Sequence, residues 1–255
     1  MSGLAYDAAG EGTPTMLFLH GWCCDRSSFG PQFDHFSAAH RVAAVDLPGH
    51  GESALPAEFK IEAFATEVAT LTRSLDLGRT VVLGHSLGAM VALALTQQAP
   101  ELVSAVAMVD PPPLSKEVWK GFAAQLVPSF QGPDGAAGRR RFVEQMFLPT
   151  DDPVRRAEIV KTMCAVPNEI AIPMVSAMAA FDSVAVLREC DVPVLTIASA
   201  VPTNDSVFLL DANPAMTIGQ TVGAGHFHQL EVPEQVNLMI ERFLSVIPGG
   251  ALWER

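Results

Sequence analysis

Ser86 is the residue in this sequence whose surroundings most suggest chemistry. Together with His85 it interrupts the apolar segment VVLGHSLGAMVALAL, and Gly84 and Gly88 flank the pair. A strand that ends before this turn and a helix that begins after it would place Ser86 at the tip. The glycines permit such a turn because they lack the side chains that would collide with the neighbouring strand or helix. A serine hydroxyl held out of the core in this way is a candidate nucleophile.

A nucleophilic serine also requires a base and donors for the negative charge that develops during the reaction. A serine with its ordinary pKa is a poor nucleophile, so an imidazole that is neutral near physiological pH must take its proton. Leu87 would offer a backbone N–H in the first turn of the helix, where the helix dipole favours negative charge. The pentapeptide GHSLG by itself is only moderately specific, and a serine in an ordinary glycine-flanked turn is the alternative interpretation.

Three further motifs accompany GHSLG in a fixed chain order. They are FLHGW at 18–22, DLPGHGES at 46–53 and GAGHFHQLEVPEQVNLMIERFL at 223–244. With GHSLG between the second and the third, the sequence resembles the α/β-hydrolase superfamily over nearly its whole length. This resemblance implies a triad of serine, acid and histidine in that chain order, which works without a cofactor or a metal ion.

The resemblance assigns the base of the triad to His226 and the second oxyanion donor to Trp22. His226 ends the GAGH loop that follows the last strand of the family, and Trp22 follows the dipeptide HG in FLHGW. Leu87 supplies the first donor, and Cys23 is the alternative to Trp22. The ring of Trp22 would also stand at the entrance of the pocket, where it suits an apolar acyl or aromatic group.

The acid of the triad is missing from the position that the family normally uses. That position lies three residues after a glycine at the end of VPVLTIAS, and here Ser199 and Pro202 occupy the two places. Asp110 in AMVDPPP ends the preceding strand, from which some members of the superfamily supply their acid, and Asp205 in PTND is the alternative. We expect Asp110, because a strand end is a rigid support for a group that must hold one imidazole tautomer. If it is not the acid, Asp110 would cap the turn before the three prolines, and Asp205 would be the N-cap of a helix in SVFLLDA.

Short apolar runs alternate with helical patterns along most of the chain. The runs are apolar on both faces, which is typical of strands in a parallel sheet that helices cover on both sides. Apolar residues at helical spacing follow at 64–75 and at 236–243. The order predicts an α/β fold with a mostly parallel sheet covered by helices on both faces, as in the α/β-hydrolase fold. The expected strands are TMLFLHG (15–21), RVAAVDLPG (41–49), TVVLGHS (80–86), VSAVAMVD (103–110), VPVLTIAS (192–199) and MTIGQTVGAG (216–225).

A long segment without a convincing strand separates the fourth and fifth of these runs. It is too long for an ordinary connection, so we expect a helical cap, inserted after strand 6 as the fold counts its strands. The predicted domains are a core of residues 1–110 and 186–255 and a cap of residues 111–185. Helical patterns in the cap are centred on 117–127, 139–147, 154–165 and 170–180.

Several large side chains are candidates for contact with a substrate. Trp119 and Phe147 belong to the predicted cap and are expected to line the pocket beneath it with Trp22. Further candidates from the cap are Phe122, Phe130, Met146, Met163, Met174 and Met178. His85 occupies the variable position beside the nucleophile, and His228 follows the base closely enough to face the same pocket. The loops of His20 and His50 correspond to positions that the family uses structurally.

The overall composition argues against several other classes of protein. A formal charge of −12 disfavours nucleic acid as a partner, and the basic run Arg139–Arg141 is expected to be a solvated helix face. Neither a signal peptide nor an apolar run of about 20 residues is visible, so we expect a cytoplasmic protein with no membrane partner. The four cysteines have no disulfide or zinc spacing and are expected to be reduced, with no metal site. The sequence does not indicate an oligomeric state.

These features together predict a serine hydrolase that cleaves a carboxylic ester or a lactone through an acyl-enzyme. The substrate is expected to be a small molecule with an apolar acyl or aromatic group. A serine at position 86 argues against the dehalogenases and epoxide hydrolases of the superfamily, which use aspartate there. Hydrolysis of a C–C bond of the meta-cleavage type, hydrolysis of an amide or peptide, perhydrolysis, and a weakly catalytic small-molecule receptor on the same fold stay open as alternatives.

Overall fold

A seven-stranded sheet forms the centre of the protein in a computed structural model that describes residues 3–247. Its strand order is β1-β3-β2-β4-β5-β6-β7, and neighbouring strands are parallel except for the antiparallel pair of β1 and β3. This arrangement confirms the predicted mostly parallel sheet. The strands are β1 (Tyr6–Ala9), β2 (Thr15–Leu19), β3 (Val42–Val45), β4 (Thr80–His85), β5 (Val103–Val109), β6 (Val194–Ala198) and β7 (Thr217–Gln220).

The central strands are buried on both faces, as their unbroken apolar sequences predict. Every residue of β2, β3 and β4 is buried. Strand β1 is not among the predicted strands. It has the sequence YDAA and is mostly exposed, so it lacks the apolar run on which the other strands were predicted. It joins the sheet at its edge, where Tyr6 to Ala9 pair with Val45 to Val42.

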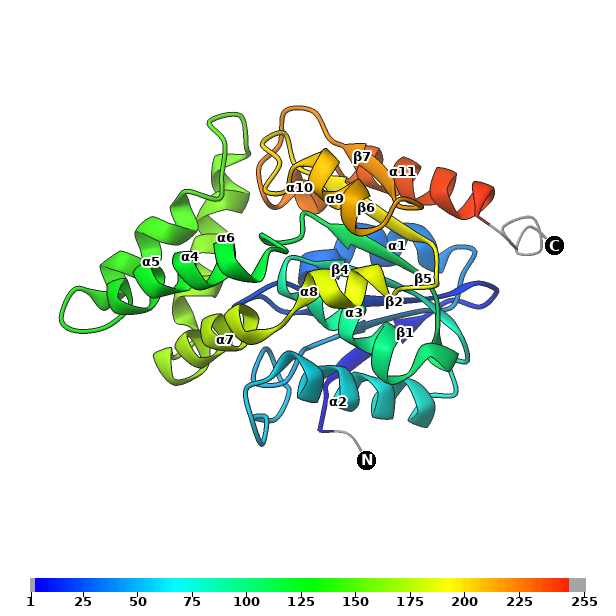
Figure 1. The fold of residues 1–255 in the computed structure, drawn as a ribbon, viewed down its shortest axis with the longest axis horizontal. Coiled ribbons are helices and arrows are strands. Elements are labelled where there is room, and N and C mark those ends of the chain that lie inside the picture. Colours follow the sequence, from blue (N-terminus) through cyan, green and yellow to red (C-terminus); the bar gives the residue numbers. More distant parts are fainter. Residues whose placement is uncertain (1–2, 248–255) are drawn as a thin grey trace.

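Helices cover both faces of the sheet (Figure 1). Two of them, α1 (Gly30–Ser37) and α11 (Pro233–Val246), bury residues in a cluster with the side chains of one face. The other face packs against α2 (Ile61–Ser74), α3 (Leu87–Gln98), α8 (Ser183–Arg188) and α9 (Ser206–Ala212). In α2 the buried residues include Ile61, Phe64, Val68 and Leu71, which form the apolar stripe expected of a surface helix.

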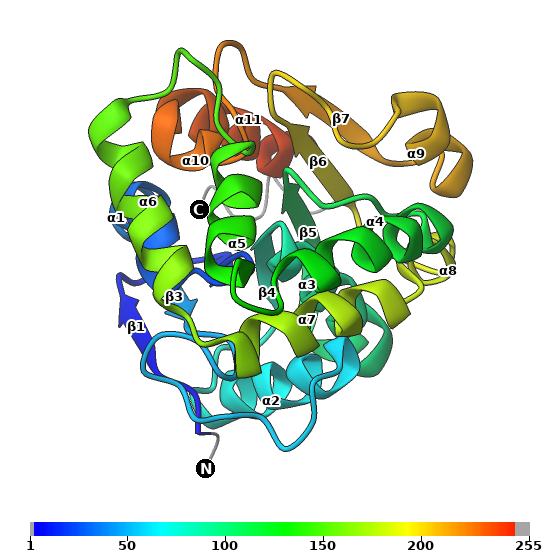
Figure 2. The same cartoon turned by 90° about the vertical axis from the view of Figure 1, so that its left-hand side faces the viewer.

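Four helices between β5 and β6 gather at one end of the sheet, on the left of Figure 1 and toward the viewer in Figure 2. This segment is the helical insertion that the sequence predicts, and it follows the fifth strand of this sheet. The boundaries drawn between cap and core stay a prediction, and residues 1–2 and 248–255 of the predicted core lie outside the described residues. The helices are α4 (Lys116–Ser129), α5 (Gly135–Glu144), α6 (Pro153–Ala165) and α7 (Asn168–Ala180).

The basic run Arg139–Arg141 differs from its prediction, because it is not a solvated face throughout. Arg139 is buried, and its guanidinium donates hydrogen bonds to the carbonyls of Cys164 and Val166 at the end of α6. A cation at this place satisfies backbone carbonyls that have no partner within the helix. Arg139 therefore joins α5 to α6 inside the insertion.

The cysteines and the apolar helices add two observations. Cys23, Cys24, Cys164 and Cys190 are all free thiols. Within residues 3–247, no single helix is long and apolar enough to cross a membrane. Helices α6 and α7, which are bent by 95° relative to each other, reach the required length and apolar composition only as a pair.

Candidate active site

Ser86 stands between β4 and α3 in a backbone conformation that few residues adopt. Its φ is 50° and its ψ is −114°, so a non-glycine residue is held in a strained turn. The two flanking glycines make this turn possible. A Cβ atom on Gly84 would lie 2.3 Å from the carbonyl oxygen of Gly88, and one on Gly88 would lie 2.0 Å from that of Leu19 in β2. A side chain at either position would therefore collide with the neighbouring strand or helix, as predicted.

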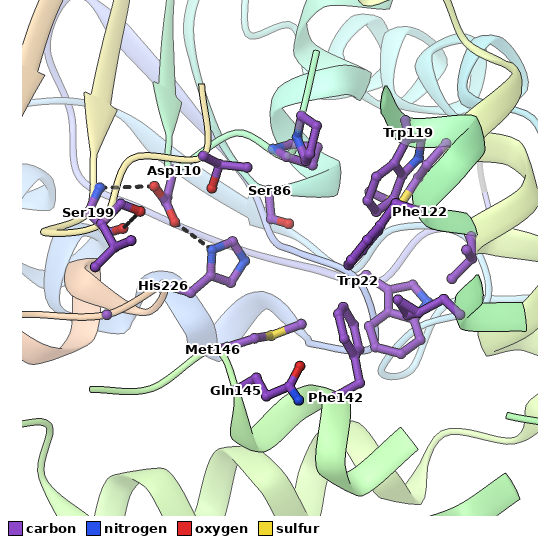
Figure 3. Close-up of a pocket in the computed structure, with 18 of the residues that line it drawn as sticks. Trp22, Ser86, Asp110, Trp119, Phe122, Phe142, Gln145, Met146, Ser199 and His226 are labelled. Carbon is purple, nitrogen blue, oxygen red and sulfur yellow. Dashed lines mark hydrogen bonds and ion pairs between the residues drawn. The ribbon is translucent and has the colours of Figure 1, made fainter. Parts of the chain in front are cut away.

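Asp110 and His226 form a hydrogen-bonded pair at the carboxyl ends of the strands (Figure 3). The Nδ1–H of His226 donates to Oδ2 of Asp110 over 2.7 Å, and the N–H of Ser199 donates to Oδ1 over 2.9 Å. Asp110 follows β5 directly and is only 2% exposed. The carboxylate accepts the proton on Nδ1 in a hydrogen bond, so in the neutral imidazole Nε2 carries the lone pair and can act as a base.

Ser86 and His226 line one cavity with Asp110, although no hydrogen bond joins the serine hydroxyl to the imidazole among the described residues. Such bonds are often long in proteins without substrate and tighten when the substrate binds. The arrangement can therefore support proton transfer from Ser86 to His226.

Asp205, the alternative acid, lies elsewhere. Its side chain accepts hydrogen bonds from the N–H groups of Val207 and Phe208 at 2.9 and 3.2 Å and so caps the start of α9. Capping of this helix is the structural role expected for Asp205. The structure thus places Asp110, and not Asp205, beside the imidazole of His226.

The two backbone donors expected around an oxyanion are not used elsewhere. The hydrogen bonds recorded for residues 3–247 include none donated by the N–H of Trp22 or of Leu87, the first residue of α3. The alternative donor Cys23 is engaged, because its N–H donates to Nε2 of His50 over 3.1 Å. The suggestion of Cys23 is therefore corrected, whereas Trp22 and Leu87 stay available.

Two buried histidines, His20 and His50, hold the loops around the site. His20 accepts from the N–H of Leu47, and His50 accepts from that of Cys23, so each needs an unprotonated Nε2. Burial lowers the pKa of His20 to about 4 and that of His50 to about 3. Both rings are thus neutral supports at physiological pH, as the family resemblance implies.

Three residues predicted to contact substrate are not among those that line the cavity, which corrects their assignment. His85 is fully buried in the turn of residues 84–88, which we call the elbow. Its Nε2–H donates to the carbonyl of His226 over 3.0 Å, and burial holds its pKa well below the usual range. His228 is also fully buried, with Nδ1 2.9 Å from the hydroxyl of Thr221. Phe147 stacks on Phe227 with ring centroids 5.3 Å apart instead of facing the cavity.

The cavity has a volume of about 450 Å³ and is mostly apolar. Trp22 and Trp119 line it as predicted, and the ring of Trp22 is fixed because its Nε1–H donates to the carbonyl of Ala171 over 2.9 Å. Of the further candidates from the cap, Phe122, Met146 and Met178 also line the cavity, whereas Phe130, Met163 and Met174 are not among its lining residues. Sequence reasoning missed Phe142 and Gln145. Phe122 is three residues after Trp119 and shares its face of α4, so helical spacing brings the two rings together.

An aromatic wall, defined as Trp22, Trp119, Phe122 and Phe142, occupies the side of the cavity opposite His226 (Figure 3). Trp119 and Phe122 stack with centroids 5.1 Å apart, and Phe142 contacts Phe122 and Trp22 at 5.6 and 5.8 Å. Neither Lys nor Arg is among the described residues that line the cavity. The space between this wall and Ser86 can therefore hold an uncharged apolar or aromatic group.

Comparison with known proteins agrees with the fold. The family model described as "Alpha/beta hydrolase family" matches residues 16–237. A Haemophilus influenzae protein named "Putative esterase/lipase" is 26% identical over 245 residues, which cover 91% of this chain and 84% of that protein.

Solved structures with low sequence identity share the fold. A thermophilic esterase from Thermogutta terrifontis has a TM-score of 0.82 at 23% identity, covering 94% of this chain and 92% of its own. The enol-lactonase from Burkholderia xenovorans LB400 has a TM-score of 0.83 at 22% identity, covering 95% and 96%. The motifs, the sheet and the family match together show that this chain belongs to the alpha/beta hydrolase family.

Proposed function

We propose that this member of the family is a serine hydrolase that cleaves a carboxylic ester or lactone of a small, largely apolar substrate through an acyl-enzyme. Ser86 is the nucleophile, His226 the general base and Asp110 the acid that orients the imidazole. The observation that carries the proposal is the 2.7 Å hydrogen bond between His226 and Asp110 beside the cavity that Ser86 lines.

The acylation step follows from the positions of these groups. The Oγ atom of Ser86 attacks the carbonyl carbon of the substrate while its proton passes to Nε2 of His226. The negative charge on the carbonyl oxygen is stabilised by the free N–H groups of Trp22 and Leu87. When the tetrahedral intermediate collapses, the bond to the leaving oxygen breaks, and the imidazolium of His226 returns the proton to the alcohol.

Deacylation repeats the same steps with water. His226 takes a proton from water as the water oxygen attacks the acyl carbon, and the proton then returns to Oγ of Ser86. An ester yields a carboxylic acid and an alcohol, whereas a lactone yields one hydroxy acid. No redox change occurs, and every proton is exchanged through His226.

The substrate class is inferred from the lining of the cavity. The aromatic wall favours planar or apolar groups, and a volume of about 450 Å³ suits a small molecule. A substrate carboxylate would enter a low-dielectric cavity with no Lys or Arg among its described lining residues, which would leave the charge unpaired. Uncharged esters and lactones are therefore preferred to their carboxylate-bearing analogues.

A comparison of matched substrates tests this proposal. We expect hydrolysis of short-chain p-nitrophenyl esters and of uncharged lactones, with kcat/KM about tenfold or more higher than for analogues in which the acyl chain ends in a carboxylate. Ser86→Ala should abolish turnover of all of them, whereas the control Ser176→Ala, on the exposed surface of α7, should retain it. Equal rates for charged and uncharged analogues would contradict the substrate class.

A further inference from the structure

Asp151 is a buried carboxylate with an unusual place in the fold. It lies in the turn between α5 and α6, is 6% exposed and is not among the residues that line the cavity. Its Oδ2 accepts from the N–H of Leu148 over 2.7 Å, and its Oδ1 accepts from the N–H of Gly225 over 3.0 Å. The first bond closes the turn, and the second reaches the residue that precedes His226.

Other contacts fasten the same two segments together. The N–H of His226 donates to the carbonyl of Met146 over 2.9 Å, and the hydroxyl of Thr150 donates to the carbonyl of Gly223 over 2.9 Å. Segment 146–151 of the insertion is therefore hydrogen-bonded to the main chain on both sides of Gly225. We name these contacts, together with the bond from Gly225 to Asp151, the histidine-loop clasp.

Gly225 shows how closely the segments approach. Its φ is not in the left-handed region, yet a Cβ atom there would lie 2.6 Å from Oδ2 of Asp151 and 2.6 Å from the carbonyl oxygen of Met146. The glycine is required because the turn of the insertion lies directly against the loop. This close packing means that a shift of the turn must also shift the loop that carries His226.

We propose that Asp151 is a positioning residue, which fixes the main chain of Gly225 and His226 and thereby couples the place of the imidazole to the docking of segment 146–151. This inference rests on the proposed role of His226. Asp110 fixes the orientation of the imidazole ring through its bond to Nδ1. Asp151 fixes the position of the main chain that carries the ring, through its bond to the N–H of Gly225. Met146 and Leu148 belong to the same turn and also line the cavity, so one carboxylate organises both a cavity wall and the base.

The carboxylate form is needed because both of its partners are N–H donors. In Asp151→Asn, one of the two side-chain positions becomes an NH₂ group, which cannot accept a hydrogen bond. One bond of the pair is lost, and a donor faces a donor at the buried contact. A misplacement of the reacting groups by about 1 Å is sufficient to reduce turnover about 10²-fold.

The test compares Asp151→Asn with a matched variant of the neighbouring carboxylate. Asp152 caps α6 through hydrogen bonds from Val154 and Arg155, and its side chain makes no recorded contact with the loop of residues 223–226. Asp152→Ala should therefore weaken the insertion without acting on His226. We expect kcat for an uncharged p-nitrophenyl ester to fall about 10- to 100-fold in Asp151→Asn and less than threefold in Asp152→Ala.

A spectroscopic measurement separates positioning from general stability. The proton that His226 donates to Asp110 should give a low-field ¹H NMR resonance, assigned by its loss in Asp110→Asn. We expect Asp151→Asn to shift or broaden this resonance and Asp152→Ala to leave it unchanged. Equal effects of the two variants on kcat and on the resonance would overturn the proposal.

A third variant keeps the proposal testable if Asp151→Asn does not fold. Thr150 is exposed, and Thr150→Val removes only the bond to Gly223. It should lower kcat two- to fivefold and shift the same resonance, and an unchanged resonance would count against the clasp. Because the resonance does not depend on turnover, failure of the proposed function would appear separately, as turnover that survives Ser86→Ala.

Discussion

Two residues with strained backbones, Ser86 and Asp110, occupy the ends of adjacent strands. Their φ values are 50° and 39°, and a non-glycine residue in this region costs about 1–3 kcal/mol. The sheet supports both residues. The N–H of Ser86 donates to the carbonyl of Val109 over 3.1 Å, and that of Asp110 donates to Ile197 over 2.8 Å. The ladder between β4, β5 and β6 therefore also sets the separation of the proposed nucleophile and acid.

The first prediction concerns the acid. Asp110→Asn should lower kcat/KM about 10⁴-fold, the size of effect known for loss of a triad aspartate, because the amide favours the wrong imidazole tautomer. Asp205→Asn should change it less than twofold, since asparagine also caps a helix well. Steady-state kinetics of both variants on one ester measures the two effects. A larger loss in Asp205→Asn than in Asp110→Asn would show that Asp205, and not Asp110, is the acid of the triad.

At the scale of elements, α3 and the insertion position the chemistry in different ways. Helix α3 lies so close to β2 and β4 that only glycine fits at positions 84 and 88. The insertion instead contributes side chains, with Trp119 and Phe122 from α4 and Phe142 from α5. The elbow therefore depends on close backbone contact, and substrate preference depends on how α4 and α5 dock.

A pair of glycine variants tests the close contact. Gly88→Ala should destabilise the protein by about 3 kcal/mol or more, because the new Cβ would lie 2.0 Å from a backbone oxygen of β2 that cannot move alone. Gly121→Ala in α4 meets no atom within 4 Å and should stabilise the protein by up to about 1 kcal/mol. Urea unfolding measures both. A neutral Gly88→Ala would mean that α3 can shift away from β2.

The aromatic wall leads to a prediction about selectivity. Phe142→Leu should lower kcat/KM about two- to tenfold for a phenyl-bearing ester and change it little for an acetate ester, because ring–ring contacts contribute about 0.5–1.5 kcal/mol. The matched control is Phe33→Leu. Phe33 belongs to α1 and packs against the face of the sheet that α1 and α11 cover. An equal loss for both esters in Phe142→Leu would indicate a general packing defect instead of a ring-binding wall.

For the molecule as a whole, the buried histidines link stability to pH. Burial lowers the pKa of His20 and His228 to about 4 and that of His50 to about 3, from an ordinary value of 6.5. The unfolded chain therefore binds protons first as the pH falls below 6.5, and the folded state loses relative stability until its own histidines titrate.

Stability should thus be highest above pH 6.5 and should decline between about pH 6.5 and 4, by up to about 1.4 kcal/mol per pH unit for each of these histidines. Urea unfolding at several pH values measures the slope. His50→Gln should reduce the slope of the unfolding free energy against pH by up to about 1.4 kcal/mol per pH unit, which is the contribution of one proton. This variant also lowers the stability at neutral pH. A free energy of unfolding that is constant from pH 7 to pH 5 would contradict the neutral, desolvated histidines.

Much of this architecture is predictable from local patterns, and the exceptions have physical reasons. Strands β2 to β6 are apolar on both faces, so composition alone indicates them, whereas β1 depends on its pairing with β3. Asp110 can be inferred because the family's usual acid position is vacant and a carboxylate ends the neighbouring strand. Phe147 and His228 were misplaced because periodicity gives the face of an element but not the neighbour that this face meets. The same limit hid Phe142 and Gln145, whose exposure to the cavity depends on how the insertion docks.

The central claim is that Ser86 is the nucleophile of an acyl-enzyme, and covalent labelling tests it most directly. A serine-directed phosphonate ester should inactivate the protein with one equivalent bound, and peptide mass spectrometry should locate the adduct on Ser86. Ser86→Ala should not be labelled, and Asp110→Asn should be labelled far more slowly. Full hydrolytic activity after complete labelling, or an adduct at another residue that accompanies inactivation, would contradict the mechanism.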